Sequence, residues 1–96
     1  MDDLINTDYI GKVAYSKSGR DEGRLFIILS IINDEFVYIS DGDLRTVEKP
    51  KKKKIKHLDV KSITAEEISK LLRSGEEVTN NMVKKFLQSM NSNEEV

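Results

Sequence analysis

Two basic segments of this sequence contain the side chains that are candidates for binding a ligand. The first is a glycine-containing turn in which Lys17, Arg20 and Arg24 surround Gly19 and Gly23. Ammonium and guanidinium groups, together with the open backbone of glycine, can approach the phosphates of a nucleic acid closely. A tight turn with solvated charges explains the same spacing, and spacing alone favours that simpler interpretation.

The second segment runs from Arg45 to Lys56 and holds seven Lys or Arg residues and one acidic residue, Glu48. Lysines gathered in this way could neutralise several phosphates and release their counterions, which would make binding sensitive to salt. A solvated loop, or a strand edge protected against aggregation, is the alternative. The run lies between expected strands rather than in a tail, which counts in favour of a fixed basic surface. The candidate contacts are Arg45, Lys49, Lys51, Lys52, Lys53, Lys54, Lys56 and His57.

Catalysis lacks the groups that it needs. The chain has one His and no Cys, so a Cys-His pair is impossible and a Ser-His-Asp arrangement would have to use His57. Neighbouring lysines disfavour a proton on His57, which we expect to be structural or to contact phosphate. Asp41 and Asp43 flank Gly42 and are more typical of a turn than of a cation site. We therefore expect no catalytic residue, no metal and no cofactor, and a protein that is not an enzyme.

Aromatic residues could add base stacking to phosphate contacts. Of the three Tyr and three Phe residues, most are expected in the core. Tyr15 and Tyr38 could present a hydroxyl at the surface, but the sequence does not show which side of a strand they face. No aromatic residue is assigned to a nucleic acid on this basis.

The elements that must position these residues are mainly β-strands. We expect five short strands, at residues 10–17, 24–32, 36–40, 44–49 and 55–58. The run 24–32 is apolar throughout, which suits a strand covered on both faces, and 33–35 has hairpin-turn chemistry. Pro50 fits a loop or an edge. Short strands joined by turns favour a small barrel over a sheet with helices on its faces.

After Val60 the pattern becomes helical. Thr64 and Glu67 have the spacing of a capping box, and Gly75 provides a stop. Thr79 could cap a second helix. Helices this short barely persist alone in water, so their apolar stripes must be buried on each other, on the barrel, on a second copy or on another protein. The stripe of the second helix comprises Met82, Val83, Phe86, Leu87 and Met90.

Length, composition and charge limit the classes of protein to which this chain can belong. With 96 residues, 38% of them hydrophobic and 34% charged, the chain fits one compact domain, which we divide into a barrel, 1–60, and a helical extension, 61–96. The net charge of −1 conceals a basic centre, because residues 11–57 carry eleven bases against seven acids. No apolar run reaches the length of a membrane span and no signal sequence is evident, so we expect a soluble cytoplasmic protein with no membrane partner.

The stretch from Gly11 to Arg24, Asp41-Gly42 and the basic segment from Lys51 to Leu58 together resemble small bacterial KOW-domain RNA-binding proteins. These are similar to the archaeal and eukaryotic large-subunit ribosomal proteins that carry a KOW motif. The resemblance covers roughly residues 9–60. It implies a mainly β, SH3-like barrel whose first inter-strand loop contacts ribosomal RNA, followed here by two short C-terminal helices.

The resemblance also implies roles for single residues. Gly23 looks like the KOW glycine, and Lys17, Gly19, Arg20 and Arg24 would be the loop contacts, with Lys51 to Lys56 as an adjoining phosphate clamp. Our leading hypothesis is therefore a non-catalytic, ribosome-associated RNA-binding protein that reads shape and phosphates. The alternative is a protein-interaction module that docks on translation or transcription machinery through the barrel and the apolar stripe of the second helix.

Overall fold

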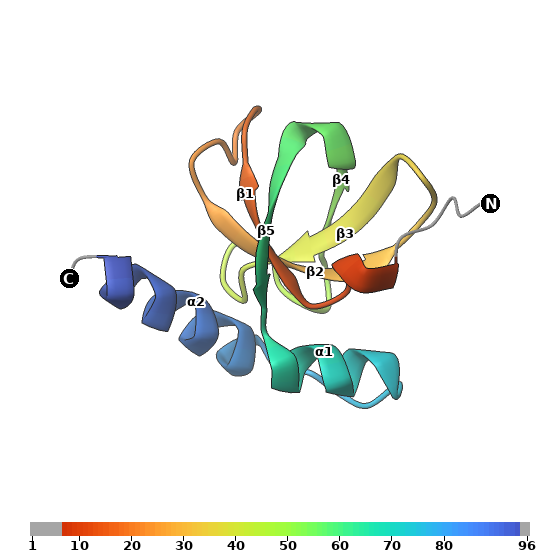
Figure 1. Ribbon diagram of the computed structural model, residues 1–96, viewed down its shortest axis with the longest axis vertical. Helices are drawn as coiled ribbons and strands as arrows, with labels where there is room; N and C mark the ends of the chain where they lie inside the picture. The colour runs from red at the N-terminus through yellow and green to blue at the C-terminus, as the bar shows by residue number, and fades with distance from the viewer. Residues whose placement is uncertain (1–6, 95–96) are drawn as a thin grey trace.

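The computed structural model describes residues 7–94 and has the predicted mainly β fold. Five strands form one antiparallel sheet in the order β4-β3-β2-β1-β5. The sheet curls into a small open barrel, with two helices against one side of it (Figure 1). The elements are η1 (Thr7–Tyr9), β1 (Lys12–Ser16), β2 (Leu25–Ile31), β3 (Phe36–Ser40), β4 (Lys51–Lys54), η2 (Ile55–His57), β5 (Leu58–Thr64), α1 (Glu66–Arg73) and α2 (Asn80–Glu94).

The interior of the barrel is filled by one face of the curled sheet. Alternation along the strands places every second side chain on that face. The interior cluster consists of Ala14, Phe26, Ile28, Val37, Ile39 and Leu58, all buried. β5 crosses back to pair with β1 rather than extending the meander, so β4 and β5 are the two edges of the curled sheet.

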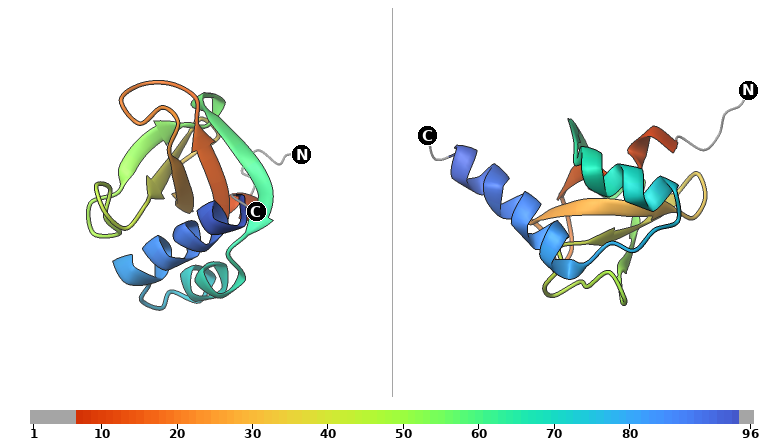
Figure 2. Two further views of the ribbon diagram at one scale, coloured as in Figure 1. Left: turned by 90° about the vertical axis from the view of Figure 1, so that its left-hand side faces the viewer. Right: turned by 90° about the horizontal axis from the view of Figure 1, so that it is seen from below.

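A second cluster lies outside the barrel, between the sheet and the helices. The outward side chains Val13 and Ile27 are fully buried there under α1 and α2. From α2, Val83 and Leu87 are buried in this cluster, and Met82, Phe86 and Met90 are half-buried against it. The helices thus cover one outer face of the sheet, as Figure 2 shows from below. The apolar stripe of the second helix is used inside the chain, and β2 is covered on both faces as its sequence predicts.

Two glycines permit the close approach of the helices to the barrel. A Cβ atom built on Gly11 would lie 2.4 Å from the Cβ of Ser69 in α1. One built on Gly42 would lie 2.3 Å from the carbonyl oxygen of Asn80 at the start of α2. Both glycines also have a positive φ that L side chains rarely adopt.

Several local predictions are confirmed. The turn at 33–35 is held by the Asn33 side chain, whose Oδ1 accepts the backbone N–H groups of Glu35 and Phe36 at 2.8 and 2.9 Å. Gly75 ends α1 with a positive φ. Thr79 caps α2, because its Oγ1 accepts the N–H of Met82 at 3.2 Å.

The strand expected at 44–49 is wrong, because that segment is a loop. Side chains from outside this segment accept hydrogen bonds from backbone N–H groups that would otherwise pair with a neighbouring strand. Asp41 accepts the N–H of Arg45 at 2.9 Å, and Asn80 of α2 accepts the N–H of Val47 at 2.8 Å. The fourth strand is instead the lysine run itself, β4, which pairs with β3.

The strand expected at 55–58 and the capping box also need correction. Residues 55–57 form η2, and β5 continues from Leu58 through Thr64, so residue 60 lies inside a strand. Thr64 is therefore extended, and the N-cap of α1 is Ala65, which offers no capping side chain. The pairing of β5 with β1, which joins Lys12 to Thr64, overrides the local helix signal.

Candidate nucleic-acid interface

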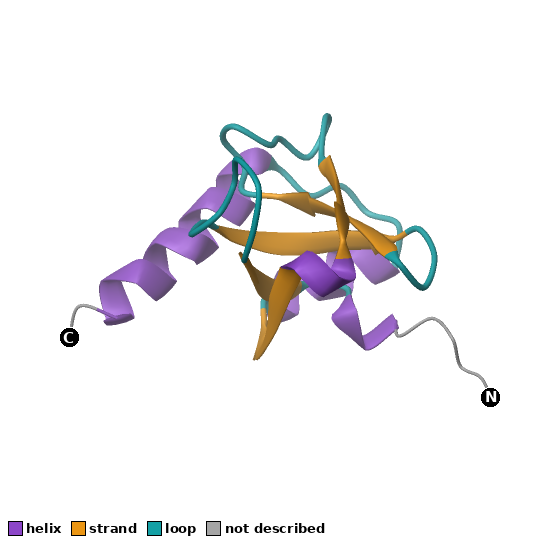
Figure 3. Cartoon of the chain, turned by 90° about the horizontal axis from the view of Figure 1, so that it is seen from above, coloured by secondary structure: helices purple, strands orange, loops and turns teal. Residues whose placement is uncertain are grey.

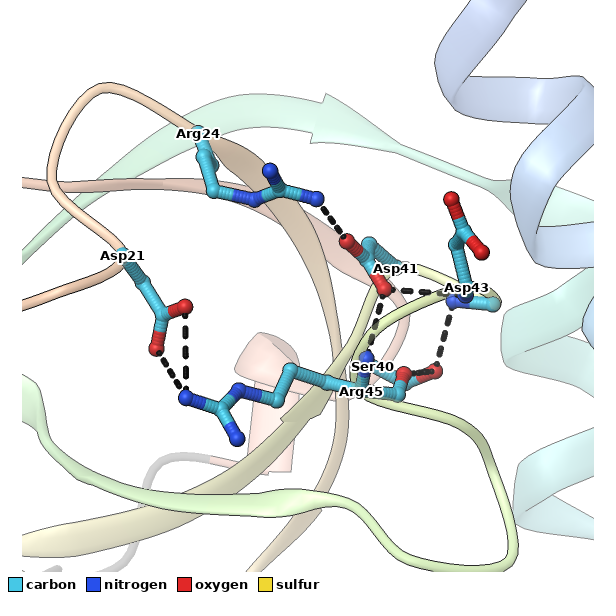
Figure 4. Close-up of polar contacts among 7 residues, drawn as sticks. Asp21, Arg24, Ser40, Asp41, Asp43 and Arg45 are labelled. Carbon is cyan, nitrogen blue, oxygen red and sulfur yellow. Dashed lines mark hydrogen bonds and ion pairs between the residues drawn. The ribbon is translucent and has the colours of Figure 1, made fainter.

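Two loops at one end of the barrel are joined by crossed ion pairs. Nη2 of Arg24, at the end of the β1–β2 loop (residues 17–24), lies 2.6 Å from Oδ2 of Asp41 in the β3–β4 loop (residues 41–50). In the opposite direction, Nη2 of Arg45 lies 3.3 Å from Oδ2 of Asp21. Figure 4 shows the two pairs side by side, and Figure 3 shows in teal the loops and turns that connect the strands. We refer to these four residues as the loop clasp.

Asp41 is the anchor of the loop clasp. Its side chain is 8% exposed, and its Oδ1 accepts the backbone N–H groups of Asp43 and Arg45. Burial raises the pKa of this carboxyl, but the hydrogen bonds from Arg24 and from the two amides outweigh it, and the pKa lies below its ordinary value of 3.8. Asp41 is therefore ionised at neutral pH and holds both loops.

The four lysines of β4 do not share one environment. Lys53 is 8% exposed and faces the interior beside Val37, its partner in the register. Its Nζ donates to the carbonyl oxygen of Ser18 at 2.8 Å, which ties β4 to the β1–β2 loop. A Cβ atom at Gly19 would lie 3.2 Å from this Nζ, so the glycine leaves room for the lysine. Lys52 and Lys54 point outward and are exposed, and Lys51 is half-buried.

A third tie brings η2 beside the same loop, because the N–H of Lys17 donates to the carbonyl oxygen of His57 at 2.9 Å. Basic side chains therefore lie on neighbouring segments of the barrel: the two loops, β4 and η2. Within residues 7–94, those outside the loop clasp form no ion pair with a carboxylate. We call these residues the basic surface. It comprises the exposed residues Lys17, Arg20, Lys49, Lys52, Lys54 and Lys56, and the half-buried residues Lys51 and His57.

The candidate residues from the sequence thus divide into two groups. Arg24, Arg45 and Lys53 hold the frame, whereas the other cations are free to meet a ligand. Gly23 is exposed at the end of the β1–β2 loop with a φ of 87°, and its N–H donates to the carbonyl oxygen of Ser16 at 2.9 Å. Sequence reasoning missed the ion pairs of Asp21 and Asp41: Asp21 lies within the first basic segment, and Asp41, which precedes the second, was interpreted only as a turn residue.

Aromatic rings lie next to the basic surface. Nζ of Lys52 lies 4.6 Å, and Nζ of Lys54 5.9 Å, from the ring centroid of Phe36 on β3. Tyr38, two residues along the same strand, is 37% exposed. The alternation in Phe36–Ser40 predicts that these two rings share a face, but the sequence does not tell which face is outside.

Other chemistry finds little support among the residues that the structure describes. Within 7–94 no group of three or more His, Cys, Asp or Glu side chains is placed to hold a metal ion. In the same range, no helix has the length and apolar character needed to cross a membrane. The arrangement is suited to binding an extended anion through charge.

A curled five-stranded sheet, a glycine-containing first loop and an adjoining basic strand define a small KOW-type, SH3-like barrel of the ribosomal-protein kind. No family model matches the chain. It is 32% identical over 71 residues to the Bacillus subtilis protein named "Putative ribosome-binding protein YbzG", an alignment that covers 74% of this chain and 96% of that protein. The chain belongs to the same family as that protein.

A second relative supports the KOW resemblance. The chain is 40% identical over 50 residues to the large ribosomal subunit protein eL14 of Desulfurococcus amylolyticus. The alignment covers 52% of each protein, so the chain spans about half the length of this relative. The resemblance to KOW-motif ribosomal proteins predicted from the sequence is confirmed.

Proposed function

We propose that this chain is a non-catalytic, ribosome-associated RNA-binding protein whose basic surface contacts the phosphates of ribosomal RNA. The observation that carries the proposal is a set of basic side chains on the adjoining β1–β2 loop, β4 and η2, none of which forms an ion pair within residues 7–94. The names of the two relatives, a ribosome-binding protein and a ribosomal protein, supply the kind of target. Such a protein works in the cytoplasm, where ribosomes are.

The loop clasp makes phosphate binding by this surface efficient. Long cationic side chains lose conformational entropy when they bind, and a loop that must also become ordered adds to that cost. Here the two ion pairs and the Lys53 hydrogen bond already fix the loops before RNA arrives. Binding therefore has to order only the side chains of the basic surface.

The residues of the site take separate roles in this proposal. Phosphate contacts come from Lys17, Arg20, Lys49, Lys51, Lys52, Lys54, Lys56 and His57. Gly19 and Gly23 let the loop backbone approach the RNA closely. Arg24, Arg45 and Lys53, which the sequence places among the contacts, act by positioning the loops.

The alternative, a protein-interaction module, has less support. The α2 stripe on which it depended is packed against the sheet, with Val83 and Leu87 buried. Among the described residues, the large aliphatic side chains that remain exposed are Ile32 and Leu44, in two different loops, and Ile63 of β5. Scattered exposed apolar residues are normal on a folded protein.

Salt-dependent binding to ribosomal RNA tests the proposal. A double variant, Lys17→Ala with Lys56→Ala, removes two cations of the basic surface, and Lys70→Ala with Lys85→Ala removes two exposed cations from the helices. Each phosphate contact contributes about 0.7–0.9 to the slope of log K against log salt. We expect the first double variant to flatten the slope by about 1.5 and the second to leave it unchanged. Absence of salt-dependent binding by the native protein, or equal losses in the two variants, contradicts the proposal.

A further inference from the structure

The outer face of β3 and β4 carries two aromatic rings and two lysines in register. Tyr38 is paired with Lys52 and Phe36 with Lys54 across the two strands. Directly opposed residues of an antiparallel pair project from the same face of the sheet. We call these four residues the aromatic-lysine face.

The ring of Tyr38 is accessible from the solvent. Its partner on the other side, in β2, is Ser30, a small and exposed residue. The helices instead cover Val13 and Ile27, farther along the sheet. Tyr38 is 37% exposed although it lies in the middle of a strand that has neighbours on both sides. An exposed ring at such a position is available to a ligand.

The two rings differ in what already contacts them. Lys52 and Lys54 both place their Nζ atoms near the ring of Phe36, at 4.6 and 5.9 Å from its centroid. Within the described chain, no cation lies over the ring of Tyr38 in this way. Tyr38 therefore presents an aromatic surface without a cation over it, and the two ammonium groups lie to one side of it, near Phe36, where each could meet a phosphate.

An open aromatic ring next to two cations fits a nucleotide with an exposed base. Base stacking on an aromatic side chain needs an unstacked base, which loops, bulges and ends of RNA provide and a continuous double helix does not. Phosphates on either side of that base carry the charge that Lys52 and Lys54 complement. An acidic peptide would satisfy the lysines but would leave the ring unused.

We propose that the aromatic-lysine face binds an unpaired nucleotide of RNA, with the base stacked on Tyr38 and the flanking phosphates at Lys52 and Lys54. The inference rests on the proposed RNA-binding function and deepens it by naming the class of RNA. The protein would then select RNA with loops or bulges over uninterrupted duplex, and the basic surface would supply the phosphate contacts common to both.

The test compares two RNAs and three variants of the full chain. One RNA is a hairpin with 2-aminopurine in its loop, and the other is the same strand annealed to its full complement. Tyr38→Thr removes the ring and puts in its place a β-branched residue that favours strands, and Tyr38→Phe keeps the ring without the hydroxyl. Ile63→Thr is the matched control, because Ile63 is 44% exposed on β5, which β2 and β1 separate from β3 in the sheet.

We expect Tyr38→Thr to weaken binding to the hairpin by about 5- to 150-fold, the range that corresponds to loss of one stacked base. Binding to the duplex should change by less than about twofold, because only phosphate contacts act there. Tyr38→Phe and Ile63→Thr should bind both RNAs like the native protein. The 2-aminopurine fluorescence should change when the native protein or Tyr38→Phe binds, and not when Tyr38→Thr binds.

Failure of this inference and failure of the proposed function give different results. If the native protein binds both RNAs and Tyr38→Thr binds them equally well, the inference is overturned and phosphate binding stands. Equal loss on both RNAs also overturns it, because a stacking role predicts selectivity. If the native protein binds neither RNA but binds polyglutamate, both proposals are wrong and the face recognises an acidic peptide.

Discussion

At the scale of single residues, chemically identical side chains take opposite roles. Lys53 and Lys54 are neighbours in β4, yet Lys53 is inside the barrel with its Nζ on the carbonyl of Ser18, and Lys54 is exposed. The alternation of a strand causes this, because successive side chains point to opposite faces. A basic run in a strand therefore contains both structural and solvent-exposed lysines.

This difference predicts separate effects of two neighbouring substitutions. Lys53→Ala should lower the free energy of unfolding by about 1.5–3 kcal/mol, because it removes a charged hydrogen bond and leaves the carbonyl of Ser18 with only the Ser16 hydroxyl as donor. Lys54→Ala should change it by less than about 0.5 kcal/mol and should reduce the salt dependence of RNA binding. Urea unfolding of both variants measures the first quantity. Equal stabilities would show that Lys53 has no structural role.

At the scale of elements, the β3–β4 loop connects the basic surface to the helices. Asn80 at the start of α2 accepts the N–H of Val47, and its Nδ2 donates to Oε1 of Glu48 at 2.8 Å. The hydrogen bond from Asn80 lowers the pKa of Glu48 below its ordinary value of 4.5. The one acidic residue of the basic segment is thus held by α2.

Substitution of two glycines with the same backbone conformation measures how tightly α2 packs on this loop. Gly42 and Gly75 both have a φ of 76°. Gly75 has open space around it, whereas a Cβ atom on Gly42 would meet backbone atoms of Asn80 and Lys84. Gly75→Ala should cost about 1–2 kcal/mol from the left-handed conformation alone. Gly42→Ala should cost about 1–3 kcal/mol more, because α2 must shift.

Chemical denaturation of the two alanine variants provides the measurement. A similar loss of stability in both would mean that α2 can move away from the β3–β4 loop without cost. In that case the clasp and the helices would be independent of each other.

At the scale of the whole molecule, the β-strands contribute side chains to two hydrophobic cores. The interior cluster uses one face of β1 and β2, and the helix-covered cluster uses the other, where Val13 and Ile27 are fully buried. The proposed division into residues 1–60 and 61–96 thus separates segments that share a core, and it also cuts β5. Small domains have little stability to spare when buried apolar area is lost.

Truncation after Thr64 tests whether the barrel needs its helices. The fragment 1–64 keeps every strand and loses both helices, which exposes the apolar outer faces of β1 and β2. We expect it to lose cooperative urea unfolding or to associate, as followed by circular dichroism and by its mass in solution. A monomeric fragment whose free energy of unfolding lies within about 1 kcal/mol of that of the full chain would establish the barrel as an independent unit.

The sequence by itself determined features that depend on near neighbours. The strand at 24–32, the Asn33 turn, the stop at Gly75 and the Thr79 cap all rest on interactions within a few residues, and the pattern of residue types was enough to find them. The overall class, a KOW-type barrel followed by two helices, followed from the order of these elements and from the family resemblance.

Only the tertiary structure decided which candidate cations face a ligand. The Lys53 hydrogen bond joins residues 35 positions apart, and the clasp pairs join residues 17 and 24 positions apart. The strand expected at 44–49 failed for the same reason, because Asn80, 33 positions away from Val47, supplies the acceptor that shapes the loop. The side of a strand that becomes interior is fixed by what packs on it, and that partner is remote in sequence.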